Sequence, residues 1–173
     1  MLETQGDPER RKMVLTSQII VAALAAGCLF LLLIVLLMVP GTLGSWDLGL
    51  GKPLTLIALL AAFGILGARI VVPGVIATQM LRQLARRGAK EPEWKNLFAV
   101  YQTTLIIKAA MLEGAIFLLL VMHMLERSPW TLVLAMVLLL VLLMHVPTSL
   151  RVDDWIQRQS LALEQAARDG INP

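Results

Sequence analysis

The chain has 173 residues, of which 58% are hydrophobic and 16% are charged, and its formal net charge is +3. Soluble domains have about 45–50% apolar and about 25% charged residues, so this composition excludes an ordinary soluble enzyme, a disordered tail and a nucleic-acid binder. The single cysteine, Cys28, also excludes an internal disulfide framework. The apolar excess lies in four blocks, each long enough to cross a bilayer, for which about 20 apolar residues suffice.

Each apolar block is predicted to be a membrane-spanning helix. The first block follows a basic segment, as in a signal peptide, but it is far longer than the apolar core of about 7–15 residues that signal peptides have. We therefore interpret it as a retained anchor. A loop rich in glycine and proline, containing Trp46, follows it, and Pro73 is expected to kink the second helix. The predicted spans are residues 14–39, 54–80, 99–125 and 130–150.

The fold class predicted from these blocks is all-α. Lipid cannot satisfy backbone polar groups, so a spanning segment is a helix or part of a closed barrel, and continuous apolar runs without two-residue alternation exclude the barrel. We expect a polytopic membrane protein with four antiparallel transmembrane helices in a bundle and a C-terminal cytoplasmic amphipathic helix. That last helix should start near Asp153, stop near Gly170 and carry Ile156, Leu163 and Ala167 on one side. The predicted divisions are an N-terminal segment at 1–13, a transmembrane domain at 14–150 and a tail at 151–173.

The basic residues are distributed unevenly between the two sides of the predicted membrane. Three precede the first span, five lie between the second and third spans and three lie in the tail, whereas the other side holds only Lys52 and Arg127. Cytoplasmic segments carry the excess of lysine and arginine. We therefore expect both termini to be cytoplasmic and the protein to be integral to the cell (inner) membrane. Its expected partners are the lipid bilayer and other membrane subunits or further copies of the chain, and no nucleic acid.

Four polar residues within the spans form a candidate intramembrane cluster. Arg69 and Glu113 lie equally far in sequence from Glu91, at the centre of the second loop, so an antiparallel pair of helices places both at the same depth near the middle of the bilayer. We expect them to form an ion pair, since an unpaired charge there costs about 2.5–3.5 kcal/mol. Lys108 lies about 7.5 Å nearer the loop, at the level of His145. The alternatives are a pair that sets the register of the hairpin, a proton or ion relay, and a cluster that a partner subunit completes.

Small residues near this expected pair indicate close contact between helices. Small side chains spaced four apart let two helix backbones approach each other. Within one chain such residues pack neighbouring helices more often than they form a dimer. The candidate packing residues are Gly64, Gly67, Gly74, Ala110 and Gly114.

One hairpin carries a further pattern. Its basic loop begins Leu81-Arg82-Gln83-Leu84-Ala85-Arg86-Arg87 and is followed by Glu93, and its second helix contains Ala109-Ala110-Met111-Leu112-Glu113-Gly114-Ala115-Ile116. With these features, residues 64–125 resemble the c subunit (proteolipid) of rotary ATP synthases. The resemblance implies that Glu113 is an ion-carrying carboxylate. It departs from the family in its scattered glycines and in having Arg69 beside that carboxylate on the same chain.

No motif for catalysis, a metal or another cofactor is present. The two histidines, His123 and His145, are expected near opposite ends of their helices, His123 at the membrane interface, so they do not predict a shared metal site. The first hypothesis is therefore a non-enzymatic accessory or interaction subunit with a buried Arg69–Glu113 ion pair. The alternative is a proton or cation translocating element with Glu113 as the carrier. A membrane enzyme with its substrate near Lys108 is the least favoured class.

Overall fold

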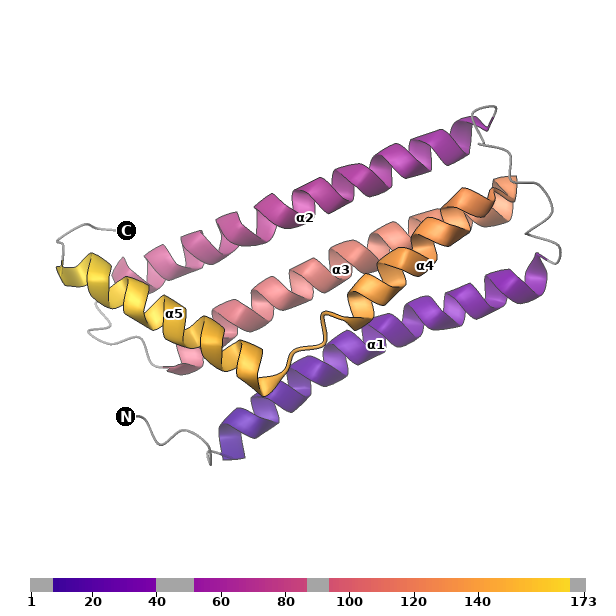
Figure 1. The fold of residues 1–173 in the computed structure, drawn as a ribbon. Coiled ribbons are helices and arrows are strands. Elements are labelled where there is room, and N and C mark those ends of the chain that lie inside the picture. Colours follow the sequence, from indigo (N-terminus) through magenta and orange to yellow (C-terminus); the bar gives the residue numbers. More distant parts are fainter. Residues whose placement is uncertain (1–7, 40–51, 87–93, 169–173) are drawn as a thin grey trace. The chain divides into compact units, whose positions relative to one another are not determined.

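The computed structural model describes residues 8–39, 52–86 and 94–168, which form five helices and contain no strand (Figure 1). The all-α prediction is thus confirmed for this part of the chain. Other expectations fall outside the described residues, namely those on Trp46, Arg87, Lys90, Glu93 and the side chains of Leu163 and Ala167. The helices are α1 (Pro8–Met38), α2 (Pro53–Arg86), α3 (Trp94–Glu126), α4 (Pro129–Leu143) and α5 (Ser149–Arg168).

Three of these helices are long and apolar enough to cross a bilayer. Their qualifying segments are Arg11–Met38 in α1, Pro53–Gln83 in α2 and Lys95–Glu126 in α3. Helices α2 and α3 extend beyond both ends of their predicted ranges, and α1 begins six residues before its range and ends one residue short of it, because polar residues at the helix ends continue the backbone hydrogen bonding. Long apolar helices of this kind indicate a membrane protein.

The fourth predicted span is too long. Instead of continuing to residue 150, α4 ends at Leu143 and has 15 residues, or about 22 Å at 1.5 Å per residue. The amides of His145 and Val146 donate to carbonyl oxygens only three residues back, those of Leu142 and Leu143. Pro147 explains the end of the helix, since it has no amide hydrogen and disfavours a helical conformation in the residue before it. A new helix, α5, then begins at Ser149, four residues before the expected start at Asp153.

The chain divides into two compact units, and each of α1, α2 and α3 contributes a segment to both. Unit 1 comprises Met1–Ile19, Val72–Ile107 and Pro147–Pro173, and unit 2 comprises Ile20–Val71 and Lys108–Val146. Unit 1 therefore contains α5, and unit 2 contains α4. The candidate polar cluster belongs to unit 2.

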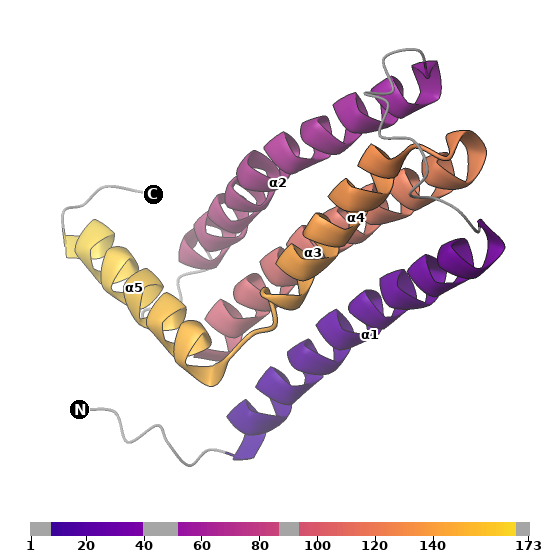
Figure 2. The same cartoon turned by 45° about the vertical axis from the view of Figure 1, so that its right-hand side comes forward.

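In unit 2, α4 lies beside α3, as both views show (Figures 1 and 2). The inner side of α1 carries Val21, Cys28 and Val35 at a seven-residue spacing, and all three are fully buried. Such a spacing keeps one stripe of a helix facing its neighbours. The buried share of the most apolar stretch is 39% in α3 but only 17% in α2. Many large apolar side chains therefore point outward, which suits a surface that lipid covers.

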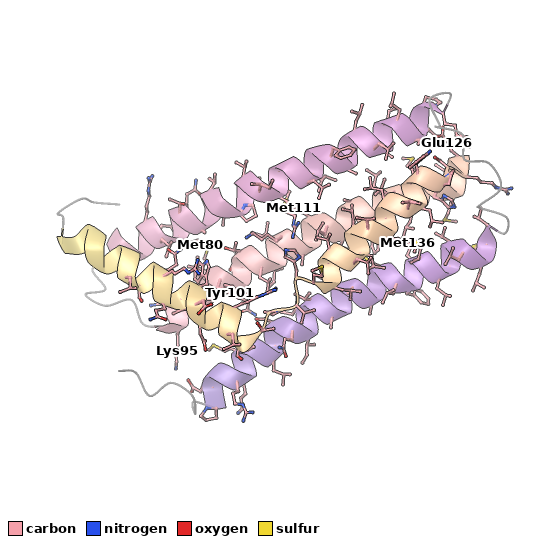
Figure 3. The ribbon with its side chains drawn as sticks, in the orientation of Figure 1. Met80, Lys95, Tyr101, Met111, Glu126 and Met136 are labelled. Carbon is pink, nitrogen blue, oxygen red and sulfur yellow. The ribbon has the colours of Figure 1, made fainter. Side chains whose placement is uncertain are left out.

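In unit 1, the first half of α5 packs against the starts of α1 and α3. The core consists of Val14, Phe98 and Val152, with Met13, Tyr101 and Ile156 packed around it. The ring of Tyr101 lies 5.4 Å from the ring of Trp155, centroid to centroid. The tail helix is amphipathic as expected, but its described apolar side is covered by the chain itself. Figure 3 shows Lys95 and Tyr101 on this part of α3.

An exposed ion pair joins two helices of unit 1. Lys95 Nζ lies 2.7 Å from Glu9 Oε2, and their side chains are 48% and 59% exposed. The hydrogen bond and charge of Lys95 lower the pKa of Glu9 below its ordinary value. A carboxyl with a lowered folded-state pKa stabilises the fold above its unfolded pKa, and this contribution disappears as the pH falls through the lower folded value.

We expect Glu9→Gln to lower the melting temperature slightly at neutral pH, because exposed pairs contribute little and salt screens them. The difference between wild type and variant should shrink below about pH 4, where the carboxyl of Glu9 becomes protonated, and in high salt. Thermal unfolding of the two purified proteins across pH measures it. A difference that grows as the pH falls would contradict this account.

Candidate functional site

Arg69 lies on the inward side of α2. Thr55, Ala58 and Ala62 are buried on that helix, and Arg69 continues the same stripe seven residues after Ala62. The arginine is half-buried, whereas its neighbour Ile70 is 81% exposed. The helical period therefore turns the guanidinium toward the other helices of unit 2.

The partner of Arg69 is His145, in the turn that follows α4. Arg69 Nη2 lies 2.7 Å from His145 Nε2, and His145 Nδ1 lies 2.6 Å from the carbonyl oxygen of Val141. A guanidinium only donates and a carbonyl only accepts. Both contacts are satisfied together when Nδ1 carries the hydrogen and Nε2 accepts, so the imidazole is neutral. The buried Nε of Arg69 has no hydrogen-bond partner among the described residues.

Glu113 faces a different helix. A Cβ placed on Gly27 of α1 would lie 3.7 Å from Glu113 Oε1 and 4.0 Å from the ring of Phe117. The expected ion pair between Arg69 and Glu113 is therefore not formed, and the guanidinium bonds to His145 instead. Equal depth in the membrane did not determine which side of α3 the carboxylate occupies.

Lys108 is half-buried, and in the described structure it forms no hydrogen bond or ion pair with the other three members of the predicted cluster. It precedes Glu126 by about five complete turns of helix, so both residues lie on the same side of α3. Glu113 lies about 140° around the helix from Lys108. The structure thus brings Arg69 and His145 together and separates Glu113 from them.

The candidate packing residues face outward. Gly64, Gly67, Gly74, Ala110 and Gly114 are all exposed. A Cβ added at any of the four glycines would meet nothing within 4 Å. The expectation that these residues pack helices within the chain is therefore wrong. Gly27, which sequence reasoning did not single out, is the glycine that faces a neighbouring helix, with side-chain atoms of Glu113 and Phe117 at ordinary contact distance.

A second group of polar residues closes the turn between α3 and α4. His123, expected at the interface, is fully buried, and its Nδ1 lies 2.7 Å from the carbonyl oxygen of Ser128. The hydroxyl of Thr131 donates to the same carbonyl at 2.7 Å. Arg127 adopts φ 52° in this turn, and its amide donates to the carbonyl oxygen of His123 at 2.8 Å. These bonds close the turn between α3 and α4. The buried His123 Nε2 and Ser128 Oγ have no hydrogen-bond partner among the described residues.

Glu126 ties the end of α3 to the start of α2 (Figure 3). Its carboxylate accepts hydrogen bonds from the amides of Leu54 at 3.1 Å and Thr55 at 2.6 Å. Lys52 Nζ donates to the backbone carbonyl of the same glutamate at 2.8 Å. The carboxylate thus caps a helix that is distant in sequence, at the end where the helix dipole favours a negative charge. The sequence carried no signal for this contact, because its partners, at the start of α2 and the end of α3, are 71 and 72 residues apart in the chain.

Replacing Glu126 with alanine should lower the melting temperature by about 2–4 °C, because the first turn of α2 loses two acceptors. Glu126→Gln keeps one acceptor and should lose less. Thermal unfolding in detergent measures both. Equal melting temperatures for wild type and Glu126→Ala would show that the cap does not stabilise the protein.

No set of three or more histidine, cysteine, aspartate or glutamate side chains suited to a metal occurs in the described segments. The described part of the protein is thus defined by three long apolar helices, a shorter fourth and an internal arginine–histidine contact. Comparison with protein-family models, with curated proteins and with solved structures finds no match. The resemblance to the c subunit stays an expectation that rests on the residues quoted for it.

Proposed function

We propose that the chain is a small integral membrane protein of the cell (inner) membrane that acts as a non-catalytic accessory or interaction subunit. The three long apolar helices support membrane insertion. The outward apolar side chains of unit 2 support contact with lipid. We further propose that α4 crosses as well, so that four helices form an antiparallel bundle with both termini cytoplasmic.

The crossing by α4 follows from the distribution of charge. Termini on the same side require an even number of crossings, and three long helices make an odd number. A helix of 15 residues is shorter than the apolar layer of about 30 Å. Residues 144–148 extend it, and local thinning of the bilayer accommodates the remaining mismatch at modest cost.

The observation that carries the interaction role is the outward side of α2. Gly64, Gly67 and Gly74 occur at open positions within a helix, where each glycine costs about 1 kcal/mol relative to alanine. Lipid gains nothing from these glycines. A second transmembrane helix gains packing contacts from them, because its backbone can approach α2 closely at such positions. The occupant that fits this side of α2 is therefore a transmembrane helix.

Cysteine cross-linking in native membranes tests this role. In a Cys28→Ser background, Gly67→Cys should cross-link to a second copy of the chain or to one defined membrane protein. Ala26→Cys provides the matched control, since Ala26 is an exposed small residue of α1. Cross-linking at Gly67 that Gly64→Leu abolishes would support the role. If Gly67→Cys gives no cross-linked product, or if Ala26→Cys cross-links equally well, the interaction role is contradicted.

A second candidate function is proton or cation translocation through Glu113. One observation favours it: the carboxylate faces Gly27 on an apolar helix, and no basic side chain pairs with it in the described structure. A charge without a partner is costly in such surroundings, so the carboxyl is expected to carry a proton. Proton uptake and release there would suit a carrier.

Labelling with a hydrophobic carbodiimide tests this second function, because the reagent modifies protonated carboxyl groups within membranes. Glu113 should react in the folded protein, and high pH should protect it. Glu113→Gln should abolish labelling, whereas Glu126→Gln should not. Absence of labelling at Glu113 would eliminate the carrier.

A further inference from the structure

Helix α4 ends at the level of the middle of α2. The apolar segment of α2 runs from Pro53 to Gln83, and Arg69 lies 16 residues after its first residue and 14 before its last. Arg69 Nη2 lies 2.7 Å from Nε2 of His145, which is the second residue after α4. This contact places the end of α4 near the middle of the apolar layer that α2 crosses.

The length of α4 agrees with this depth. Glu126 ends α3 and bonds to the amides of Leu54 and Thr55. Helix α4 begins three residues later, at Pro129, and therefore near the start of α2. From Thr55 to Arg69 is 14 residues, or about 21 Å along α2, and the 15 residues of α4 span about 22 Å. Helix α4 thus covers one half of the apolar layer and stops where the other half begins.

The backbone after α4 has polar groups without partners at this depth. Residues 144–148 belong to no helix. In the described structure, the carbonyl oxygens of His145 and Val146 accept no hydrogen bond. Each such group costs several kcal/mol in lipid, so non-helical backbone at membrane depth occurs only where protein buries it or water reaches it. Both residues are only half-buried, so water is the partner that the two carbonyl groups require.

The chain after α4 leads toward the cytoplasmic end of the spans. Helix α4 stops at the level of Arg69, whereas α2 continues for 14 residues to Gln83, toward the side that the basic residues mark as cytoplasmic. In unit 1, the carbonyl oxygen of Pro147 accepts a hydrogen bond of 2.8 Å from Nε2 of Gln18. Gln18 lies seven residues, or about 10 Å, after Arg11, where the apolar segment of α1 begins. Water therefore reaches the break from the cytoplasmic side.

Arg69 gives the inner end of this break a positive charge. His145 is neutral in its hydrogen-bonding arrangement and does not balance the guanidinium. The two acidic residues in the described part of unit 2 are engaged elsewhere, since Glu113 faces α1 and Glu126 caps α2. The dipole at the end of α4 offsets only about half a charge. The remaining positive charge repels cations and attracts small anions.

We propose that the break after α4 admits water and small anions from the cytoplasm, with Arg69 at its inner end. Water bonds to the open carbonyl groups of His145 and Val146, and the guanidinium, oriented by His145, attracts the anion. Discontinuous transmembrane helices place polar binding sites near the bilayer midplane in the same way. This entry rests on the proposed membrane insertion and orientation, and it is independent of any partner helix on α2.

Cysteine accessibility tests the entry in the full chain, in native-membrane vesicles and a Cys28→Ser background. Met144→Cys is the probe, because Met144 directly follows α4 and is 73% exposed. Leu140→Cys, one turn earlier and 62% exposed, is the matched control. With small membrane-impermeant methanethiosulfonates, Met144→Cys should react in inside-out vesicles at least about tenfold faster than Leu140→Cys, because the reaction needs a hydrated thiolate.

The charge of the reagent tests the role of Arg69. The ratio of the rate with the anionic sulfonatoethyl reagent to the rate with the cationic trimethylammonioethyl reagent should be higher at Met144→Cys than at Leu161→Cys, on the exposed side of α5. Adding Arg69→Gln to Met144→Cys should lower this ratio about threefold or more, because the attracting charge is lost. Arg82→Gln removes an exposed charge from the same helix and should leave the ratio nearly unchanged.

The outcomes separate water entry from the membrane insertion on which it rests. If neither Met144→Cys nor Leu140→Cys reacts until detergent is added, insertion stands and the entry is overturned. Equal reaction of both would overturn the insertion of α4, and reaction of Met144→Cys only in right-side-out vesicles would overturn the cytoplasmic direction. A ratio that Arg69→Gln leaves unchanged, or that Arg82→Gln lowers equally, would overturn the attraction of anions. If Arg69→Gln does not fold, equal ratios at Met144→Cys and Leu161→Cys would overturn it.

Discussion

Replacing Phe98 with alanine should release α5 from the rest of unit 1. Phe98 is only 2% exposed and forms the core with Val14 and Val152, the latter from α5. Truncating a buried phenylalanine costs about 3–5 kcal/mol. Because Phe98 lies at the centre of the core through which α5 contacts the rest of unit 1, we expect the population with α5 undocked to rise by about a hundredfold or more.

Hydrogen–deuterium exchange of the backbone amides in residues 152–161 measures this release. Exchange should accelerate in Phe98→Ala by about the same factor while the amides of α4 keep their protection. Leu161→Ala is the matched control, since Leu161 lies on α5 and is 52% exposed. Unchanged exchange in Phe98→Ala would show that other contacts hold α5 in place.

Cysteines placed at residues 161 and 127 should react with a thiol reagent from opposite sides of the membrane. In a Cys28→Ser background, Leu161→Cys should react with a membrane-impermeant maleimide only in inside-out vesicles. Arg127→Cys, in the exposed turn before α4, should react only in right-side-out vesicles. The effect is all-or-none, because the reagent does not cross the bilayer and eleven basic residues favour one orientation.

The same experiment tests whether α4 crosses the membrane. If α4 lies at the surface instead, residues 127 and 161 are on the same side and both cysteines react in the same vesicles. That result would overturn the four-helix topology and leave three crossings. Labelling after solubilisation in detergent provides the control for reactivity, because both cysteines should then react fully.

The helices of this protein could be predicted because their physical causes are local. Long apolar runs without alternation predicted α1, α2 and α3. In lipid the backbone N–H and C=O groups of a segment must bond to one another, and a helix achieves this. The break predicted between the third and fourth spans, after residue 125 and before residue 130, matches the observed gap between α3 and α4. The end of α4 was missed although its cause, Pro147, is visible in the sequence. The apolar run before that proline, together with Val146 and Leu150 on either side of it, made the block look continuous.

The contacts between helices could not be predicted in the same way. Depth follows from counting residues along a hairpin, and this placed Arg69 level with Glu113, and Lys108 about 7.5 Å away at the level of His145. The rotation of each helix about its own axis does not follow from counting. That rotation decides whether Arg69 meets Glu113 or His145, and whether Gly64 and Gly67 face a neighbouring helix or the outside.

Composition and the placement of eleven basic residues are sufficient to indicate an all-helical membrane protein and to predict its orientation, because hydrophobic transfer and the charge rule act on each segment separately. The pairing of Arg69 with His145, the capping of α2 by Glu126 and the docking of α5 on Phe98 emerge from the folded chain alone. Each depends on residues far apart in sequence. Their contact is set by how the side chains of several helices fit together, and no single segment carries that information.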